Sequence, residues 1–223
     1  QLLEENIPML DTISSDRIRH ELELILREKY PEYAIRRLGE VGVLARISPS
    51  LRSNDWIAEK FDQVRLVNKP SQLLPLYFCL LVYPLSEKEI EQLISRLNMP
   101  GRLSRALRDT IRLKAELPSL DKSSMRSSEI YYLLYEYEPL AIQVNAIASE
   151  SLLIRDYLQL FLRKLRYVKT LLNGEKLKML GISPGPELGR ILETLHKAKL
   201  DGEVDTSEDE EKLALLLKRS CST

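Results

Sequence analysis

The sequence predicts an all-α protein, and three features of its 223 residues support that prediction. Apolar residues recur every three or four positions along most of the chain, which is the period of helices that bury one face. No stretch alternates apolar and polar residues as a half-buried strand does. Proline, glycine, serine and asparagine interrupt the apolar pattern at short intervals. These interruptions of the apolar pattern predict roughly ten to twelve helices joined by short turns.

Composition limits the possible functions. The chain has 33 basic and 33 acidic residues, so its formal net charge is zero and any site for nucleic acid must be a local basic patch. Two cysteines, Cys79 and Cys221, are too few for a disulfide framework, which favours a reducing cytoplasm. The longest apolar run, Leu73 to Leu85, contains two prolines and is too short to span a bilayer. No signal peptide is visible, so we expect a cytoplasmic protein without a membrane contact.

The beginning of the chain predicts capped amphipathic helices. Residues 1–13 have the pattern of a helix end followed by a turn, and the chain does not start with methionine, so we expect a piece of a longer protein. Ser14 caps the next helix, in which Arg17 and Glu21 lie four residues apart and face each other. Pro31 suits the first turn of the helix that follows.

The middle of the chain predicts its most deeply buried helix. Ser53 caps a helix that precedes it. The run from Leu73 to Tyr83 is then apolar nearly all round, as expected for a central core helix. Ser86 and Glu89 form a capping box for another amphipathic helix.

A stripe of arginines follows along one side of a helix over 101–117. Its members recur at spacings of three, three and four, and they are Arg102, Arg105, Arg108 and Arg112. Guanidinium groups pair bidentately with phosphate, so this stripe is a candidate for RNA backbone contact. The alternative is a solvated helix face with local ion pairs, for instance to Asp109 or Glu116.

A second basic stretch ends a long helix predicted over residues 150–170. Its cations are Arg163, Lys164, Arg166 and Lys169. Basic residues at a helix C-terminus complement the helix dipole, and they also suit phosphate, so both interpretations stay open. Upstream, Ser127 or Ser128 caps a helix and Pro139 starts another.

Four tyrosines gather between these basic stretches, namely Tyr131, Tyr132, Tyr135 and Tyr137. Rings spaced in this way can stack nucleobases. Packing between helices is the more common use of such residues, and the sequence leaves both open.

A glycine-rich hairpin marks residues 171–204, which contain five of the eight glycines. Gly181 can take the left-handed conformation that ends a short helix, and Pro186 suits the first turn of the next one. The exposed amides of such a turn and the helix N-terminus suit a phosphate. The alternative is a plain pair of helices whose glycines only permit close packing. A last helix follows, capped by Thr206 or Ser207, with Asp209 and Glu210 complementing its dipole.

Catalytic motifs are missing from the sequence. His20 and His196 each stand alone on a predicted helix, without a second ligand at metal spacing. No phosphate-binding glycine motif and no nucleophile motif is present. We therefore predict no metal site and no catalytic residue within these 223 residues.

Two stretches resemble a known family: ISSDRIRHELELIL, residues 13–26, and LNGEKLKMLGISPGPELGRILETLHKAKLDGEV, residues 172–204. They look like the bacterial tRNA nucleotidyltransferase and poly(A) polymerase family, also called class II CCA-adding enzymes. A third stretch, YAIRRLGEVGVLARISPSL over 33–51, fits the same family. In that family a β-rich catalytic head is followed by a helical neck, body and tail. The resemblance implies a neck over 1–69, a body over 70–170 and a tail over 171–223.

The resemblance assigns a motif usually written S-x-E-R-I-x-x-E to the neck. Its positions here are Ser14, Asp16, Arg17, Ile18 and Glu21. Asp16 departs from the motif because it is a shorter acid. The implied role is to brace the neck helices beneath the nucleotide pocket, which agrees with a capped helix start and an Arg17–Glu21 pair.

The resemblance also implies the function. The family's glycine-rich turn, its metal-binding aspartates and its base-reading motif have no counterpart here, so this chain is expected to hold RNA rather than transfer nucleotides. Mg²⁺ with ATP or CTP would belong to the missing head, and the partner would be a tRNA or another RNA 3′ end, not DNA. The candidate RNA contacts are Arg102, Arg105, Arg108, Arg112, Arg163, Arg166, Lys169, Lys176, Lys178, Gly185 and Arg190. The rival hypothesis is a helical scaffold that contacts proteins or forms a homodimer.

Overall fold

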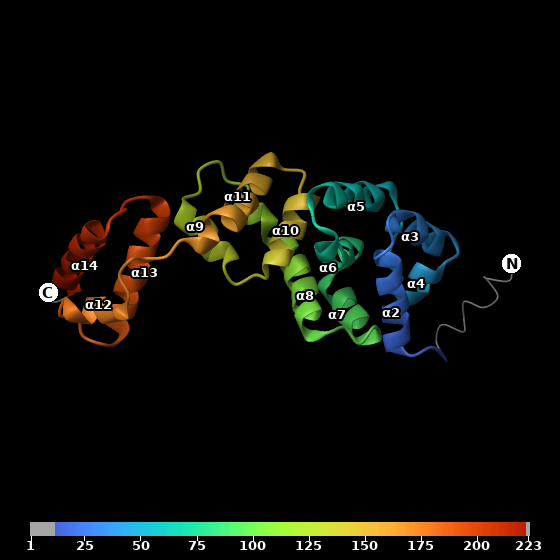
Figure 1. Cartoon of the computed structure of the whole chain (residues 1–223), viewed down its shortest axis with the longest axis horizontal. Coiled ribbons are helices and arrows are strands. Elements are labelled where there is room, and N and C mark those ends of the chain that lie inside the picture. The colour runs from blue at the N-terminus through green and yellow to red at the C-terminus, as the bar shows by residue number, and fades with distance from the viewer. Residues whose placement is uncertain (1–11, 222–223) are drawn as a thin grey trace. The chain divides into compact units, whose positions relative to one another are not determined.

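The computed structural model describes residues 12–221, with side chains described to residue 219 (Figure 1). Within that range it contains thirteen α-helices and no strand, so the predicted all-α class is confirmed. The helix end predicted within residues 1–13 lies almost entirely outside the described part of the chain.

The chain packs as two compact units. The first holds the described residues through Asp121 and Tyr137–Leu158. Its helices are α2 (Ser15–Leu26), α3 (Pro31–Glu40), α4 (Val43–Ile47), α5 (Asp55–Val67), α6 (Pro70–Val82), α7 (Glu87–Arg96), α8 (Gly101–Glu116) and α10 (Pro139–Ala148), with the 3₁₀ turn η2 (Leu117–Leu120). The second holds Lys122–Glu136 and the described residues from Gln159. Its helices are α9 (Ser127–Leu134), α12 (Gly174–Met179), α13 (Pro186–Asp201) and α14 (Ser207–Cys221), with η3 (Leu165–Tyr167). The helix α11 (Leu152–Arg163) contributes to both units.

The core of the first unit forms around α6. Residues 76–82 of this helix are all buried, as the continuous apolar run predicts. The ring of Phe61 on α5 lies 4.3 Å from the ring of Tyr77, measured between centroids. Burial of each large apolar side chain stabilises the fold by about 1.5–3 kcal/mol. A helix that is apolar on every face can bury all of its apolar side chains only at the centre of a helical array. Accordingly, α6 packs against α2, α5, α8 and α10.

Local capping signals place several helix ends as predicted. The Ser14 hydroxyl accepts a hydrogen bond from the Arg17 amide at 3.4 Å. Ser86 and Glu89 form the expected capping box. Thr206 caps α14, because its hydroxyl accepts from the Asp209 amide at 3.2 Å while the Asp209 carboxylate accepts from the Thr206 amide at 3.1 Å.

Two predicted caps are wrong. Helix α5 is capped by Asn54, not Ser53, because the Asn54 side chain accepts from the Ile57 amide at 3.1 Å. Ser127 is already inside α9, where the N-cap position is Arg126. Ser128 instead donates through its amide and its hydroxyl to Asp201 of α13, at 2.8 and 2.7 Å. A tertiary partner thus replaces the local role predicted for this serine.

Helix number and length also differ from the prediction. Thirteen helices are described where ten to twelve are predicted, and the five-residue α4 has no predicted counterpart. It follows Gly42, whose left-handed backbone (φ 80°) lets the chain turn sharply out of α3. The long helix predicted over 150–170 ends at Arg163, and η3 follows it.

The division into neck, body and tail stays a prediction. It describes functional regions, which need not coincide with units defined by packing. Among the described residues, no helix has both the length and the apolar character needed to cross a membrane.

Candidate nucleic-acid interface

The arginine stripe of α8 is largely engaged by carboxylates. Arg108 donates from Nε and Nη2 to the two Glu91 oxygens at 2.6 and 2.8 Å. These hydrogen bonds lower the pKa of the Glu91 carboxyl. Arg105 lies 3.4 Å from Glu138 and 3.9 Å from Asp109, measured between charged atoms. A phosphate that approached either guanidinium would compete with an existing acid.

The same holds for Arg112. It lies 3.4 Å from Asp109, and its guanidinium sits 4.6 Å from the ring centroid of Tyr137. Asp109 itself is buried and also accepts from the Glu138 amide at 2.9 Å. Arg102 is exposed at the start of the helix. The ion pairs anticipated as the alternative are therefore present for three of the four arginines, with Asp109 as predicted and with Glu91 and Glu138 as unpredicted partners.

The basic stretch at the end of α11 has a different electrostatic setting. No acidic residue lies between positions 163 and 169, whereas four basic residues do. Arg163, Lys164 and Lys169 are exposed and Arg166 is half-buried. In the part of the chain that the structure describes, none of the four forms an ion pair within 4.0 Å. This basic segment, defined as residues 163–169, is thus a local excess of positive charge on a neutral chain.

The backbone of the basic segment is held in place by buried contacts. Leu165 is buried, and the Tyr167 amide donates to the Lys164 carbonyl at 3.1 Å. His196 of α13 lies between two partners, with Nε2 3.2 Å from the Val168 carbonyl and Nδ1 3.2 Å from the Tyr132 hydroxyl. The histidine is therefore a packed residue that links α9, α13 and the basic segment.

The tyrosines are mainly packed between helices, as the more common interpretation predicts. Tyr131 and Tyr135 stack nearly parallel, with an interplanar angle of 8° and centroids 5.7 Å apart. Tyr131 also meets the His196 ring edge-on at 4.7 Å. Tyr137 is buried against Arg112, and burial raises its pKa to about 12.

The glycine hairpin has the predicted local geometry. At the end of α12 the Gly181 amide donates to the Lys178 carbonyl at 2.9 Å and the Ile182 amide to the Leu177 carbonyl at 3.1 Å. This pair of bonds is a Schellman motif around Gly181, whose φ is 78°. Gly185 precedes α13 with φ 144°, and Pro186 occupies the first helical position.

The candidate contacts of the hairpin lie around this turn. Lys178 and Arg190 are exposed, and Gly185 borders open space. Lys176 is exposed and donates from Nζ to the Leu171 carbonyl at 3.2 Å. The α13 N-terminus carries no side-chain cap, so its first amides are available to an anion.

Two glycines of this hairpin differ in what alanine would cost. Gly181→Ala is expected to destabilise the protein by about 1–2 kcal/mol, because a Cβ at φ 78° is strained. That Cβ would also lie 2.9 Å from Lys218 Nζ. Gly189→Ala, inside α13 with no atom within 4 Å of its Cβ position, is the matched control and is expected to stabilise by about 0.5–1 kcal/mol. Urea denaturation followed by circular dichroism measures both, and equal effects would contradict the assigned conformations.

The sequence of this chain is similar to those of known proteins. A family model described as the probable RNA and SrmB-binding site of polymerase A matches residues 1–54. The A-adding tRNA nucleotidyltransferase of Geobacter sulfurreducens is 30% identical over 227 residues, and the alignment covers 95% of this chain and 26% of that protein. This chain is therefore similar to a tRNA nucleotidyltransferase over nearly its whole length. The family resemblance predicted from the sequence is confirmed.

Solved structures of tRNA nucleotidyltransferases have the same fold. The apo structure of a CCA-adding enzyme matches with a TM-score of 0.72 at 20% identity and covers 96% of this chain and 53% of the enzyme. The Thermotoga maritima CCA-adding enzyme complexed with tRNA matches with a TM-score of 0.69 at 20% identity, covering 96% and 54%. The chain thus spans about half of these enzymes and about a quarter of the Geobacter protein.

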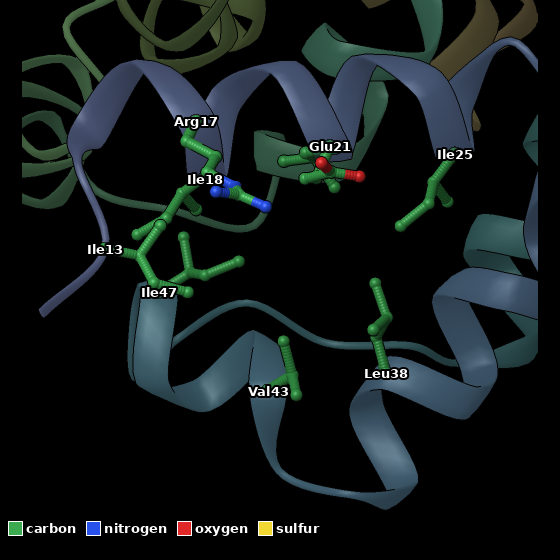
Figure 2. Close-up of a pocket in the computed structure, with 9 residues that line it drawn as sticks. Ile13, Arg17, Ile18, Glu21, Ile25, Leu38, Val43 and Ile47 are labelled. Atoms are coloured by element: carbon green, nitrogen blue, oxygen red, sulfur yellow. The ribbon is translucent and has the colours of Figure 1, made fainter. Parts of the chain in front are cut away.

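The residues that the resemblance assigns to a neck motif lie at the start of α2, within the part that the family model matches. Arg17 and Glu21 share a face of α2, as predicted, and both line an otherwise apolar pocket of about 130 Å³ (Figure 2). Opposite them lie Leu38 of α3 and two residues of α4, Val43 and Ile47. The predicted Arg17–Glu21 ion pair is not formed, since no contact within 4.0 Å joins these two described residues.

Other residues of α2 supply the tertiary contacts. Asp16 accepts from the Asn98 side-chain amide at 3.1 Å and pairs with Arg19 at 2.9 Å. Arg19 donates to the Leu97 carbonyl at 3.2 Å and to the Asn98 carbonyl. Ile18 is buried. The short acid at position 16 and the unpredicted Arg19 therefore tie α2 to the turn between α7 and α8. The role of the motif beneath a nucleotide pocket stays a prediction.

The described residues show no metal-binding cluster of three or more histidine, cysteine or acidic side chains. Cys79 is buried in the first unit, and burial raises the pKa of its thiol to about 12. It is thus a core residue, not a reactive thiol.

Proposed function

We propose that this chain binds the sugar–phosphate backbone of a tRNA-like RNA and positions its 3′ end for nucleotide addition. In this proposal a catalytic head outside the chain adds CMP or AMP from CTP or ATP, using Mg²⁺. The names of the relatives support the substrate class, because they are A-adding and CCA-adding enzymes and one of them was solved with tRNA. The description of the family model supports RNA contact in the first 54 residues.

The observation that carries the proposal is the basic segment. None of its four cations forms an ion pair within 4.0 Å among the described residues, so each can meet a phosphate without first breaking an ion pair. The α8 stripe is a weaker second contact in this proposal, because Arg105, Arg108 and Arg112 would have to exchange carboxylates for phosphates. The hairpin would add Lys176, Lys178, Gly185 and Arg190.

RNA binding is expected to depend steeply on salt and on the basic segment. The substrate is a labelled RNA hairpin with a single-stranded 3′ tail, and affinity is measured by fluorescence anisotropy. Removing one cation that meets a phosphate should reduce the slope of log affinity against log salt by about 0.7–0.9. The variant Arg163→Gln/Lys164→Gln/Lys169→Gln is therefore expected to reduce the slope by about 2.1–2.7 units and to remove most of the affinity at low salt.

The matched control is Arg105→Gln/Arg108→Gln on α8. It removes two cations that are already paired, so we expect a smaller decrease of affinity and slope. Circular dichroism confirms that both variants keep their helices. If the chain itself does not bind the hairpin at low salt, or if the triple variant binds as tightly as the parent, the proposal is wrong.

A protein-contact function is the second candidate, and exposed apolar side chains favour it. In the second unit, Met179 of α12 is 85% exposed and Leu216 of α14 is 59% exposed. An apolar surface would bind a second copy or another protein with little salt dependence. Sedimentation of the chain alone distinguishes this candidate, because a dimer disrupted by Met179→Lys and Leu216→Lys would place these residues in an interface.

A further inference from the structure

A largely exposed tyrosine, Tyr167, lies in the middle of the basic segment. The Tyr167 side chain is 65% exposed, although its neighbours Leu165 and Val168 hold the backbone. Its ring contacts a cation, since the Arg166 guanidinium lies 5.1 Å from the ring centroid. The segment therefore presents an aromatic face among four cations, in a turn of fixed conformation.

The fixed conformation matters because a ring that is ordered before binding loses little entropy on binding. The Tyr167 amide bonds to the Lys164 carbonyl at 3.1 Å and the Val168 amide to the Leu165 carbonyl at 3.0 Å. From the other side, His196 Nε2 contacts the Val168 carbonyl at 3.2 Å. The histidine ring is itself held by the Tyr132 hydroxyl at 3.2 Å. Both ends of the turn are thus anchored around an exposed ring.

We propose that Tyr167 is a stacking site for an unpaired RNA nucleobase, whose flanking phosphates contact Arg163, Lys164 and Lys169. This inference rests on the proposed RNA-binding function and adds to it the state of the RNA at this point. Bases inside a duplex have both faces covered by their neighbours, so only an unpaired base offers a free face to the ring. Rings set in a basic groove bind single strands in this manner, with little dependence on base identity.

The charge pattern favours RNA over a protein partner at this position. A protein surface would have to supply several acids to neutralise the segment, whereas successive phosphates of one strand do so by repetition. The Arg166 guanidinium lies over one face of the ring, so a base would stack on the opposite face of a ring that the cation helps to hold in place.

The test compares two-stranded RNA duplexes with and without a single-stranded 3′ tail, using the whole 223-residue chain. Tyr167→Ala is expected to weaken binding of the tailed duplex about 5- to 160-fold, the range for removal of one base–aromatic stack. Tyr167→Phe keeps the ring and should bind as the parent does. The blunt duplex has no loop and no tail, so it should bind both variants and the parent equally, and the salt dependence should not change because no charge is removed.

Two controls separate stacking from a disruption of the fold. Leu152→Ala removes another highly exposed large side chain, 70% exposed at the start of α11 and outside the basic segment, and should leave tailed RNA binding unchanged. A 2-aminopurine in the tail reports stacking directly, because its fluorescence falls when the base stacks. Quenching is expected with the parent and with Tyr167→Phe, but not with Tyr167→Ala.

The outcomes distinguish this inference from the proposed function. If the parent binds RNA with steep salt dependence while Tyr167→Ala binds tailed RNA equally well, stacking is wrong and the function stands. An equal decrease for blunt and tailed duplexes would also overturn stacking, because the ring would then support the segment and not a base. If the parent binds no RNA, both proposals fail.

Discussion

Glu210→Ala is expected to destabilise the second unit by about 3–5 kcal/mol, the range for removing one member of a buried charged network. Glu210 is fully buried in the first turn of α14. Its carboxylate accepts from the Leu171 amide at 3.1 and 2.8 Å and from the Leu172 amide at 2.9 Å. It also lies 3.7 Å from Lys199 Nζ. Removing it leaves the two amides without their acceptor, and Lys199 keeps only its contacts with Asp205.

The measurement is urea denaturation followed by far-ultraviolet circular dichroism, with hydrogen exchange at the Leu171 and Leu172 amides. Both amides should exchange far faster in the variant. Glu208→Ala is the matched control, because Glu208 is an exposed acid in the same first turn. Its effect should stay within about 0.5 kcal/mol. Equal effects at the two positions would show that Glu210 only complements the helix dipole, which is the role that the sequence predicts.

Asn145→Ala is expected to cost about 2–4 kcal/mol in the first unit, because three hydrogen bonds and a buried side chain are removed together. Asn145 is fully buried on α10. Its amide donates to the Thr110 carbonyl of α8 at 3.0 Å and to the Ala141 carbonyl at 2.9 Å. Its carbonyl accepts from the Tyr83 hydroxyl, next to the C-terminus of α6, at 3.1 Å.

Tyr83→Phe is the control for Asn145, because it removes only one of these bonds and should cost about 1 kcal/mol. Burial raises the pKa of Tyr83 from 10.0 to about 12, so the phenol remains a donor at neutral pH. Its ring stacks on Trp56 at 5.6 Å, so tryptophan fluorescence can report unfolding of this unit. In the double variant the two costs should not add, because the shared bond can be removed only once. Additive costs would show that the two side chains are not coupled.

The candidate site was only partly predictable from the sequence. The basic residues can be identified from the sequence, and their helical spacing places the α8 arginines on one side of the helix. The sequence does not show which of these cations form ion pairs with carboxylates. Glu91 lies 17 positions from Arg108 and Glu138 lies still further from Arg105, so only folding brings each pair together. Tyr167 has no periodic signal, although an aromatic residue inside an acid-free basic segment could have marked it.

The sequence by itself determined the helical class, the central position of α6 and most helix ends. These depend on the spacing of apolar residues and on caps within three or four positions, as at Ser14, Thr206 and Gly181. The tertiary structure alone decided the roles of Ser128, Asn145 and Glu210. Their most distant hydrogen-bond partners lie 73, 62 and 39 positions away in the sequence, respectively. Local rules assign a polar residue to the nearest unsatisfied backbone group. In the folded protein, a buried polar residue instead forms hydrogen bonds with donors or acceptors that the packed helices leave unpaired.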